Sequence, residues 1–391
     1  MRRLLGLSAV GVALVVGLLV ARAVDQTAAP TRRPQTLDDA LKAVEATVGA
    51  DFAKDGVGGL SMGVVLRDRL IWSRHFGYAE AEFKRAADND TAFRVGSITK
   101  QFTALALLQL VEQGKMQLTD PIEKYVPEIK AVKDRPAGSP PITLLQVATM
   151  RSGLSREPGC ANHSEGPVSV WQQKVLSCLP STTYANTPGT TYLYSNIGYA
   201  TLGLSIERAG GESYVDQVSK RILVPLRMSR SAMEPTAVVR ENLAHGYQRT
   251  REGVVSRSDP DKELDGRGYR VPNGALFSTI NDLAKFVTWE LGHSSTTLLK
   301  KETQDANYAR SWPTAPTANS SYGVGFQEIR RGDISMLGHG GSTAGYLSSA
   351  LFHRGSGLGV IVFRNCDSCP VAPGPVAAST LESLVKATAI K

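Results

Sequence analysis

The chain has 391 residues, and 42% of them are hydrophobic, which is enough for a large buried core. Its 44 Lys and Arg against 36 Asp and Glu give a formal net charge of +8. The basic residues are spread out without a Lys/Arg run, and this argues against a nucleic-acid partner. The length fits one large domain or two closely joined ones.

The N-terminus has the pattern of an export signal. Met1–Arg3 precedes an apolar run over 4–20, and a small-residue cleavage site ends at Ala23. We expect residues 1–23 to be a cleaved signal peptide and residues 24–38 to be a linker. The alternative is an uncleaved anchor, because about 17 apolar residues are near the lower limit for spanning a bilayer. We therefore expect an exported protein, periplasmic or secreted, that contacts a membrane only if this segment stays attached.

Hydrophobic periodicity predicts strands at both ends of the chain and helices between them. Strands are expected at 60–65, 70–76, 333–337, 346–353 and 357–364. Helices are expected at 36–53, 101–111, 143–150, 200–209, 213–222, 279–291 and 376–390. This order predicts an α/β (α+β) catalytic domain over 39–391, with one sheet from about 39–95 and 325–391 and a helical region over about 96–324. The active site would lie at the junction of the two regions.

Ser97 and Lys100 are the first candidate catalytic pair. They stand in Phe93–Lys100, directly before a strongly apolar helical segment. A serine hydroxyl needs a base to become a nucleophile, and a lysine three residues later on a helix lies on the same face. Backbone N–H groups at a helix start also point toward developing negative charge. Ser383 and Lys386 have the same spacing without these flanks, and we interpret them as part of a helix surface.

Two further elements offer the remaining groups of such a site. Tyr194 and Asn196 put a phenol, which can relay a proton, beside an amide, which can hold a substrate carbonyl. The third element, Gly338–Gly345, lies between two predicted strands. Glycines on a strand allow a substrate to come close, and a strand edge can offer an N–H to an oxyanion.

The three elements, in this order and with these flanks, resemble the β-lactamase-related serine hydrolases. That family includes class C β-lactamases, D-alanyl-D-alanine carboxypeptidases, D-aminopeptidases, esterases and LACTB-type proteases. The resemblance runs from about Leu60 to the C-terminus and includes the segments 125–129, 272–279 and 282–286. It implies a β-lactamase/transpeptidase-like antiparallel sheet flanked by helices, with an inserted all-helical region.

The resemblance also implies a role for each motif residue. Ser97 would be the acylated nucleophile, with Lys100 and Tyr194 as the acid/base pair. The backbone N–H groups of Ser97 and Ser342 would form the oxyanion hole. The substrate-binding residues would be Asn196, His339, Gly341 and Ser342. The family context favours Tyr194 over Tyr184, which has the same spacing to Asn186.

We therefore expect an exported serine hydrolase that forms an acyl-enzyme on amide, ester or D-Ala-D-Ala-type substrates, without a cofactor or a metal. Its partner would be a small molecule or a peptide, such as a peptidoglycan stem peptide, an ester or a β-lactam. Class C β-lactamases carry lysine at the position of His339, and histidine is only partly charged at neutral pH. We therefore expect a poor β-lactamase, whose carboxylate-bearing substrates bind more weakly as pH rises through the titration of this histidine. The alternatives are a receptor of the same fold that binds β-lactams or peptidoglycan without turnover, and a class C-type β-lactamase.

The four cysteines are Cys160, Cys178, Cys366 and Cys369. In an exported protein an even number suggests disulfides, and four cysteines allow three connectivities. On proximity we favour Cys160–Cys178 and Cys366–Cys369. A redox or zinc role for Cys366 and Cys369 is the alternative, but the chain lacks both a thioredoxin-like setting and a second pair of ligands.

Gly59–Gly63 contains a competing nucleophile motif, because it matches the G-x-S-x-G elbow of α/β-hydrolases. That motif needs a helix directly after the serine, whereas residues 64–66 continue as a strand, so we interpret Ser61 as a strand residue. The remaining histidines lack metal-binding spacing, and we expect them at the surface or in packing: His75, His163, His245, His293 and His353.

Overall fold

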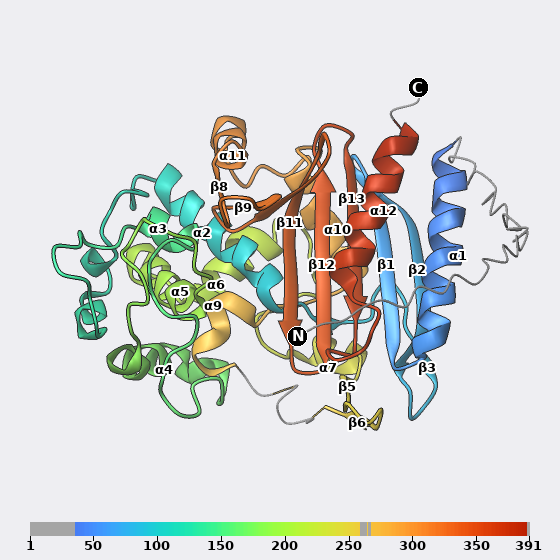
Figure 1. Cartoon of the computed structure of the whole chain (residues 1–391), viewed down its shortest axis with the longest axis horizontal. Coiled ribbons are helices and arrows are strands. Elements are labelled where there is room, and N and C mark those ends of the chain that lie inside the picture. Colours follow the sequence, from blue (N-terminus) through green and yellow to red (C-terminus); the bar gives the residue numbers. More distant parts are fainter. Residues whose placement is uncertain (1–35, 259–263, 265–266, 389–391) are drawn as a thin grey trace, which may run out of the picture. The chain divides into compact units, whose positions relative to one another are not determined.

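The structure is a computed structural model that describes residues 36–258, 264 and 267–388. Within these residues, nine strands form an antiparallel sheet in the order β3-β2-β1-β13-β12-β11-β10-β9-β8 (Figure 1). The strands of this sheet are β1 (Gly59–Leu66), β2 (Arg69–Glu80), β3 (Arg85–Ala86), β8 (Ser311–Pro313), β9 (Ser320–Gly323), β10 (Gln327–Arg331), β11 (Ile334–Thr343), β12 (Tyr346–His353) and β13 (Leu358–Arg364). Because β1 pairs with β13, the N-terminal and C-terminal parts of the domain build one sheet, as predicted.

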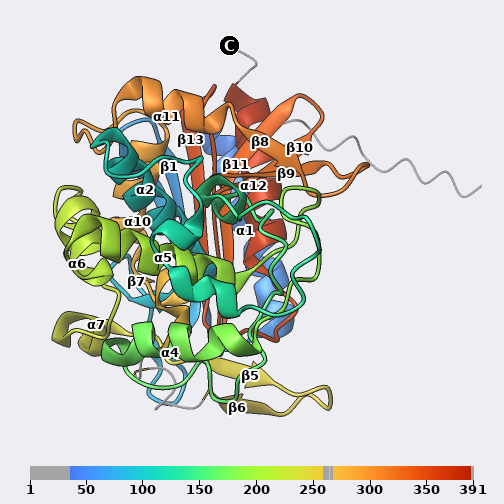
Figure 2. The ribbon, with the colours of Figure 1, turned by 90° about the vertical axis from the view of Figure 1, so that its left-hand side faces the viewer.

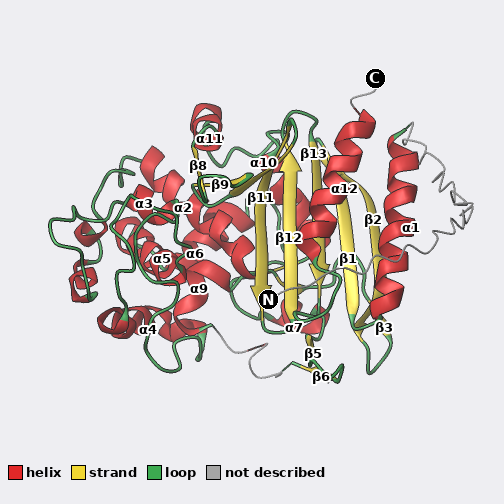
Figure 3. Ribbon diagram, viewed as in Figure 1, coloured by secondary structure: helices red, strands yellow, loops and turns green. Residues whose placement is uncertain are grey.

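Helices cover the sheet and form the region inserted into it. They are α1 (Leu37–Asp55), α2 (Thr99–Glu112), α3 (Leu144–Ala148), α4 (Trp171–Cys178), α5 (Asn196–Gly210), α6 (Tyr214–Val218), α7 (Ala237–Asn242), α9 (Val271–Gly274), α10 (Ile280–Glu290), α11 (Lys301–Tyr308) and α12 (Pro373–Thr388). Figure 3 shows α1 and α12 over one face of the sheet, with the inserted helices beside it. This is the mixed α/β architecture that the sequence predicts.

The central strands are buried on both faces. In β13, Val360 and Val362 pack into a core shared with α1 and α12, whereas Ile361 and Phe363 pack into the core that contains α10. Successive side chains of a strand point to opposite faces of the sheet. A continuous apolar run is therefore what a strand covered on both sides requires.

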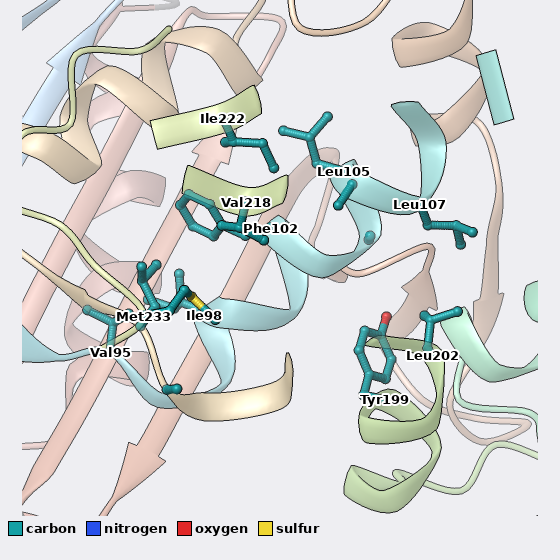
Figure 4. Packing of buried hydrophobic residues seen from close by; sticks show 14 of the residues in the cluster. Val95, Ile98, Phe102, Leu105, Leu107, Tyr199, Leu202, Val218, Ile222 and Met233 are labelled. Atoms are coloured by element: carbon teal, nitrogen blue, oxygen red, sulfur yellow. The ribbon is translucent and has the colours of Figure 1, made fainter. Parts of the chain in front are cut away.

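Helix α2 is enclosed by the inserted helices, and this fixes the position of its N-terminal end. Every residue from Thr99 to Leu110 is buried or nearly so. Figure 4 shows Phe102 and Leu105 of α2 among side chains of α5 and of the segment 218–222. A helix that is apolar all round is stable only inside such a core. Figure 2 views these helices face on, with the strands of the sheet behind them.

Several elements differ from the prediction at their ends. The strand expected at 333–337 continues to Thr343, so the third motif lies on β11 itself. The helix expected at 200–209 begins at Asn196, because the Ser195 side chain caps it by accepting from the Gly198 N–H at 3.0 Å. Asn196 is therefore held in the first turn of a helix rather than in a loop.

The inserted region is not all-helical, and the sheet extends further back along the chain than predicted. Strands β8 and β9 already belong to the nine-stranded sheet, so the C-terminal part of this sheet begins at Ser311 rather than near 325. Two small sheets pair β4 (Phe93–Arg94) with β7 (Phe277–Ser278) and β5 (Tyr247–Arg249) with β6 (Val255–Arg257). Strands β8 and β9 and the strands of the two small sheets have two to four residues each, which is too few to show an alternating hydrophobic pattern in the sequence.

Both disulfides predicted on proximity are formed. Cys160 is bonded to Cys178, and Cys366 is bonded to Cys369. The first ties the loop after Glu157 to the end of α4, and the second closes a short turn after β13.

The predicted signal peptide, and the predicted linker up to residue 35, lie outside the described residues. Helix α1 begins at Leu37, where the Thr36 side chain caps it by accepting from the Asp39 N–H at 3.1 Å. The last two residues of the predicted linker therefore belong to this helix. None of the helices in the described part of the chain is long and apolar enough to cross a membrane.

Candidate active site

Ser97 lies on a 3₁₀ turn, Gly96–Ile98, directly before α2. Gly96 has φ 51°, and a Cβ on it would lie 2.8 Å from the backbone nitrogen of Ser342. Only glycine allows both this left-handed conformation and this close approach. The Thr99 hydroxyl closes the turn by donating to the Gly96 carbonyl at 2.6 Å. The turn that carries Ser97 is thereby held against β11.

The edge of β11 is open where it meets this turn. Pairing with β10 ends at Gln327 and Gly338, so the following residues of β11 pair with β12 alone. A Cβ on Gly341 would lie 2.0 Å from the Val95 carbonyl oxygen, which explains why glycine stands there. The structure thus places the Ser342 backbone nitrogen beside the turn that carries Ser97, where the resemblance predicts an oxyanion donor.

Lys100 is completely buried, and its amine contacts three oxygens. The Nζ atom lies 3.0 Å from Ser97 Oγ, 2.9 Å from Asn196 Oδ1 and 2.9 Å from the Asn273 carbonyl oxygen. The last two are acceptors only, so they use two N–H bonds of the amine. The remaining tetrahedral position points at Ser97, and in the neutral amine it holds the lone pair.

Burial lowers the pKa of Lys100 well below its usual value, and the guanidinium groups of Arg156 and Arg270 act in the same direction. The Glu157 carboxylate opposes this shift, but burial has the larger effect. A lysine with a lowered pKa is neutral in a larger fraction of molecules near pH 7. The arrangement can therefore accept a proton from Ser97.

Tyr194 borders the same pair. Its hydroxyl lies near the Ser97 side chain, which acts to lower the pKa of Tyr194. Two basic side chains lie against its ring, since Lys100 Nζ and Arg156 Cζ are each 4.8 Å from the ring centroid. Burial nevertheless raises the pKa of Tyr194 above its ordinary value, so the phenol keeps its proton at neutral pH. Of the two candidate bases, the geometry and charges favour Lys100, with Tyr194 as a proton donor.

Glu157 supports the pair from outside, although no sequence motif predicts this role. Its carboxylate accepts from Asn196 Nδ2 at 2.6 Å, from the Tyr269 hydroxyl, and from Arg270 at 3.2 Å. Because the carboxylate accepts from the amide nitrogen, the amide oxygen of Asn196 must face Lys100. No motif marks Glu157, since only the fold brings its loop to the start of α5. Asn273, by contrast, lies in the segment 272–279, which the resemblance had marked.

The environment of His339 is not that of a side chain whose charge contacts the substrate. Its side chain is 1% exposed, Nδ1 donates to the Gly340 carbonyl, and Nε2 accepts from the Tyr322 hydroxyl at 3.0 Å. Burial, assisted by nearby Lys100, lowers the pKa of His339 to about 3. The imidazole is therefore neutral at physiological pH, and both ring nitrogens are engaged. The expectation that its titration near neutral pH controls carboxylate binding is wrong.

Ser97 and the third motif line one open cleft with a volume of about 520 Å³. The cleft is lined by Ser97, Arg156, Tyr192, Tyr194, Gln327, His339, Gly340, Gly341, Ser342, Leu347, Ser348, Ala372, Pro373 and Gly374. These residues come from strands β10, β11 and β12 of the sheet, from the segments that precede α2 and α5, and from the start of α12. The turn after the Cys366–Cys369 disulfide leads to the wall at 372–374.

The competing motifs fall elsewhere. Ser61 is fully buried on β1, where its hydroxyl lies 2.9 Å from His75 Nδ1. Tyr184 lines a separate pocket with Ile122 and other residues outside the cleft. Lys386 lies on the surface of α12 and pairs with Glu382. Ser61, Tyr184 and Lys386 therefore do not line the cleft that contains Ser97 and Tyr194.

The family model described as Beta-lactamase matches residues 37–374. The chain belongs to the β-lactamase family. Among curated relatives, Protein flp of Staphylococcus aureus (strain NCTC 8325 / PS 47) is 24% identical over 335 residues, which cover 85% of this chain and 64% of that protein. Beta-lactamase-like protein 2 of Dictyostelium discoideum is 29% identical over 264 residues, 66% of this chain and 47% of that protein. The matches thus span less than two thirds of these relatives.

Solved structures of this family share the fold. The octameric penicillin-binding protein homologue from Pyrococcus abyssi is 27% identical with a TM-score of 0.76, covering 88% of this chain and 77% of that one. A D-stereospecific amidohydrolase from Streptomyces sp. is 24% identical with a TM-score of 0.71, and the match covers 87% of this chain and 98% of that one. A class C β-lactamase is 18% identical with a TM-score of 0.72, and the match covers 89% of this chain and 96% of that one. The last two similarities concern the fold alone.

Proposed function

We propose that this protein is an exported serine hydrolase that forms an acyl-enzyme through Ser97 on amide, ester or D-Ala-D-Ala-type substrates. The observation that carries the proposal is the contact between Lys100 Nζ and Ser97 Oγ at 3.0 Å. Two fixed acceptors orient the amine toward the hydroxyl, and burial favours the neutral form that can take a proton. A serine with such a base at the floor of an open cleft fits nucleophilic catalysis.

In the proposed reaction, Ser97 Oγ attacks the substrate carbonyl carbon while its proton passes to Lys100. The N–H groups of Ser97 and Ser342 stabilise the oxyanion, and such donors are typically worth about 3–4 kcal/mol each. Tyr194 donates its proton to the leaving amine or alcohol as the C–N or C–O bond breaks, and it is reprotonated from Lys100. A water molecule then attacks the ester, its proton passes to the same relay, and Ser97 is released.

The charge of the third motif supports a preference for esters and amides over β-lactams. A lysine at position 339 would place a cation on the third-motif strand, as in class C β-lactamases, whereas His339 is neutral and buried. A D-stereospecific amidohydrolase and a penicillin-binding protein homologue are among the proteins with this fold, which is compatible with peptide or amide substrates. The two disulfides fit an oxidising compartment and so support export.

The proposal is tested by turnover on a panel of p-nitrophenyl esters, D-amino-acid amides and nitrocefin, using the purified protein. We expect measurable turnover of an ester or a D-amino-acid amide, and kcat/KM for nitrocefin at least about 100-fold lower than for the better substrate. Nitrocefin hydrolysis near the diffusional ceiling of about 10⁸ M⁻¹s⁻¹, with negligible ester turnover, would identify a true β-lactamase instead. Stable acylation without any turnover would identify a receptor.

A further inference from the structure

The cleft has an uneven distribution of charge. Among its described lining residues, Arg156 has the only charged side chain, since His339 is neutral and the others are uncharged or aromatic. A positive group at the mouth of a cleft with low-dielectric walls attracts anions more strongly than the same group on an open surface. A substrate that enters the cleft therefore meets one positive side chain.

Arg156 is held in a defined place by its surroundings. Its carbonyl accepts from the Asn196 N–H at 2.8 Å, and the neighbouring Ser155 carbonyl accepts from the Ser195 hydroxyl at 2.8 Å. Its guanidinium lies over the ring of Tyr194, with Cζ 4.8 Å from the ring centroid. A stacked guanidinium has fewer conformations to lose when it binds a ligand. Arg156 is thus positioned beside the tyrosine that borders Ser97.

The guanidinium still has capacity to bind a ligand. Among the described residues, its one carboxylate neighbour is Glu157, 3.9 Å from Nε, and that carboxylate already accepts from Asn196, Tyr269 and Arg270. In the described part of the chain, the terminal nitrogens of Arg156 have no hydrogen-bond or ion-pair partner, and its side chain is 63% exposed. Two parallel N–H donors match the two oxygens of a carboxylate.

We propose that Arg156 is a specificity-determining residue that binds a carboxylate of the substrate, so that the cleft prefers anionic substrates over neutral ones of the same shape. The inference rests on the proposed function of the same cleft. The carboxylate can belong to the acyl part of the substrate or to its leaving group. Both sources offer the same chemistry to the guanidinium, and the experiment separates them.

The first arm compares p-nitrophenyl hemisuccinate with p-nitrophenyl butyrate, which have acyl chains of equal length with and without a carboxylate. The second arm compares N-acetyl-D-Ala-D-Ala with its C-terminal amide. In at least one arm, we expect the native protein to have the higher kcat/KM for the anionic member. In Arg156→Gln, the ratio of anionic to neutral kcat/KM should fall by about 10-fold or more. The arm in which it falls identifies the source of the carboxylate.

The control is Arg240→Gln, which removes one positive charge from an exposed residue of α7 outside the cleft. It should leave both ratios unchanged, because a general effect of net charge is screened beyond about 10 Å at 0.1 M salt. Arg156→Lys keeps the positive charge but lacks the two parallel N–H donors, so it should retain part of the preference. It keeps the test informative if the glutamine variant does not fold.

Two failures are distinguishable. Equal kcat/KM values for both members in both arms of the native protein, or a preference that persists in Arg156→Gln, would overturn the role of Arg156 while leaving the hydrolase intact. Absence of all turnover together with absence of fluorophosphonate labelling at Ser97 would overturn the proposed function, and the role of Arg156 with it.

Discussion

Two regions of this molecule each bring a serine hydroxyl to a potential base. On β1, Ser61 lies 2.9 Å from His75 Nδ1, and His75 Nε2 lies 2.9 Å from Asn89 Oδ1. At the start of α2, Ser97 lies 3.0 Å from the Lys100 amine. By hydrogen-bond geometry alone, the first set resembles a catalytic triad more closely than the second does.

The difference between them lies in access and surroundings. Ser61 is 0% exposed and lies within a strand that is paired on both sides, so no carbonyl group can reach it. Ser97 lines the cleft, and the N–H of Ser342 lies beside its turn. A hydrogen-bonded serine and base therefore indicate a catalytic site only together with a cleft and an oxyanion donor.

The largest expected effect separates these two serines. Ser97→Ala should lower kcat on the best substrate by about 10⁴-fold or more, because removing the nucleophile abolishes the covalent route. Ser61→Ala should leave kcat and KM within about threefold and act mainly on stability. The measurement is steady-state turnover of both purified variants. A large loss in Ser61→Ala with a small one in Ser97→Ala would reverse the comparison.

The second largest effect concerns the proton relay. Lys100→Ala and Tyr194→Phe should each lower kcat by about 10³-fold, and the double variant should lose little more, since residues that act as a unit are not additive. Turnover of the three variants tests this, with Tyr184→Phe as the matched control outside the cleft. Losses that multiply in the double variant would show that the two residues act independently.

The sequence predicts the part of this site that local spacing encodes. Ser97 and Lys100 are one helical turn apart, and their apolar helix is visible in the pattern of residues. Glu157 escapes prediction because its contact with Asn196 joins positions 39 residues apart through the tertiary fold. The neutrality of His339 escapes it as well, because burial shifts the pKa and burial cannot be read from one residue type. The short strands β8 and β9 are not predicted, because three or four residues are too few to show an alternating pattern.

A smaller effect on activity is expected from Glu157, which contacts Asn196 behind Lys100. Glu157→Gln removes the carboxylate that raises the pKa of Lys100, so that pKa should fall further. The acid limb of the kcat/KM profile, where Lys100 loses its proton, should move to lower pH. The maximal kcat should fall by about 10-fold, because the amide of Asn196 is less firmly oriented.

Glu165→Gln, an exposed residue of the same loop, is the control for Glu157→Gln, and Glu157→Asp should restore the position of the limb in part. An unchanged pH profile with a lowered kcat would contradict the effect on the pKa of Lys100 and would indicate that Glu157 acts only by orienting Asn196.

The smallest effect on activity is expected from His339 near neutral pH. Since its pKa is lowered to about 3, no inflection of kcat/KM near pH 6.5 should arise from it. Its folded pKa lies below the unfolded value of about 6.5, so its protonation favours unfolding. The free energy of unfolding should therefore decrease as pH falls from about 6.5 toward 3, by up to about 1.4 kcal/mol per pH unit from this group.

Urea unfolding of the native protein and of His339→Asn between pH 4 and 7 measures this contribution, because the variant should lack it. An equal pH dependence in both proteins would contradict a buried neutral histidine.

The most direct test of the account is to find which serine becomes covalently modified. The native protein is treated with a fluorophosphonate, digested and mapped by mass spectrometry. We expect a single adduct on Ser97, and faster labelling as pH rises through the lowered pKa of Lys100. An adduct on Ser61, or an unmodified Ser97 in folded protein, would contradict it.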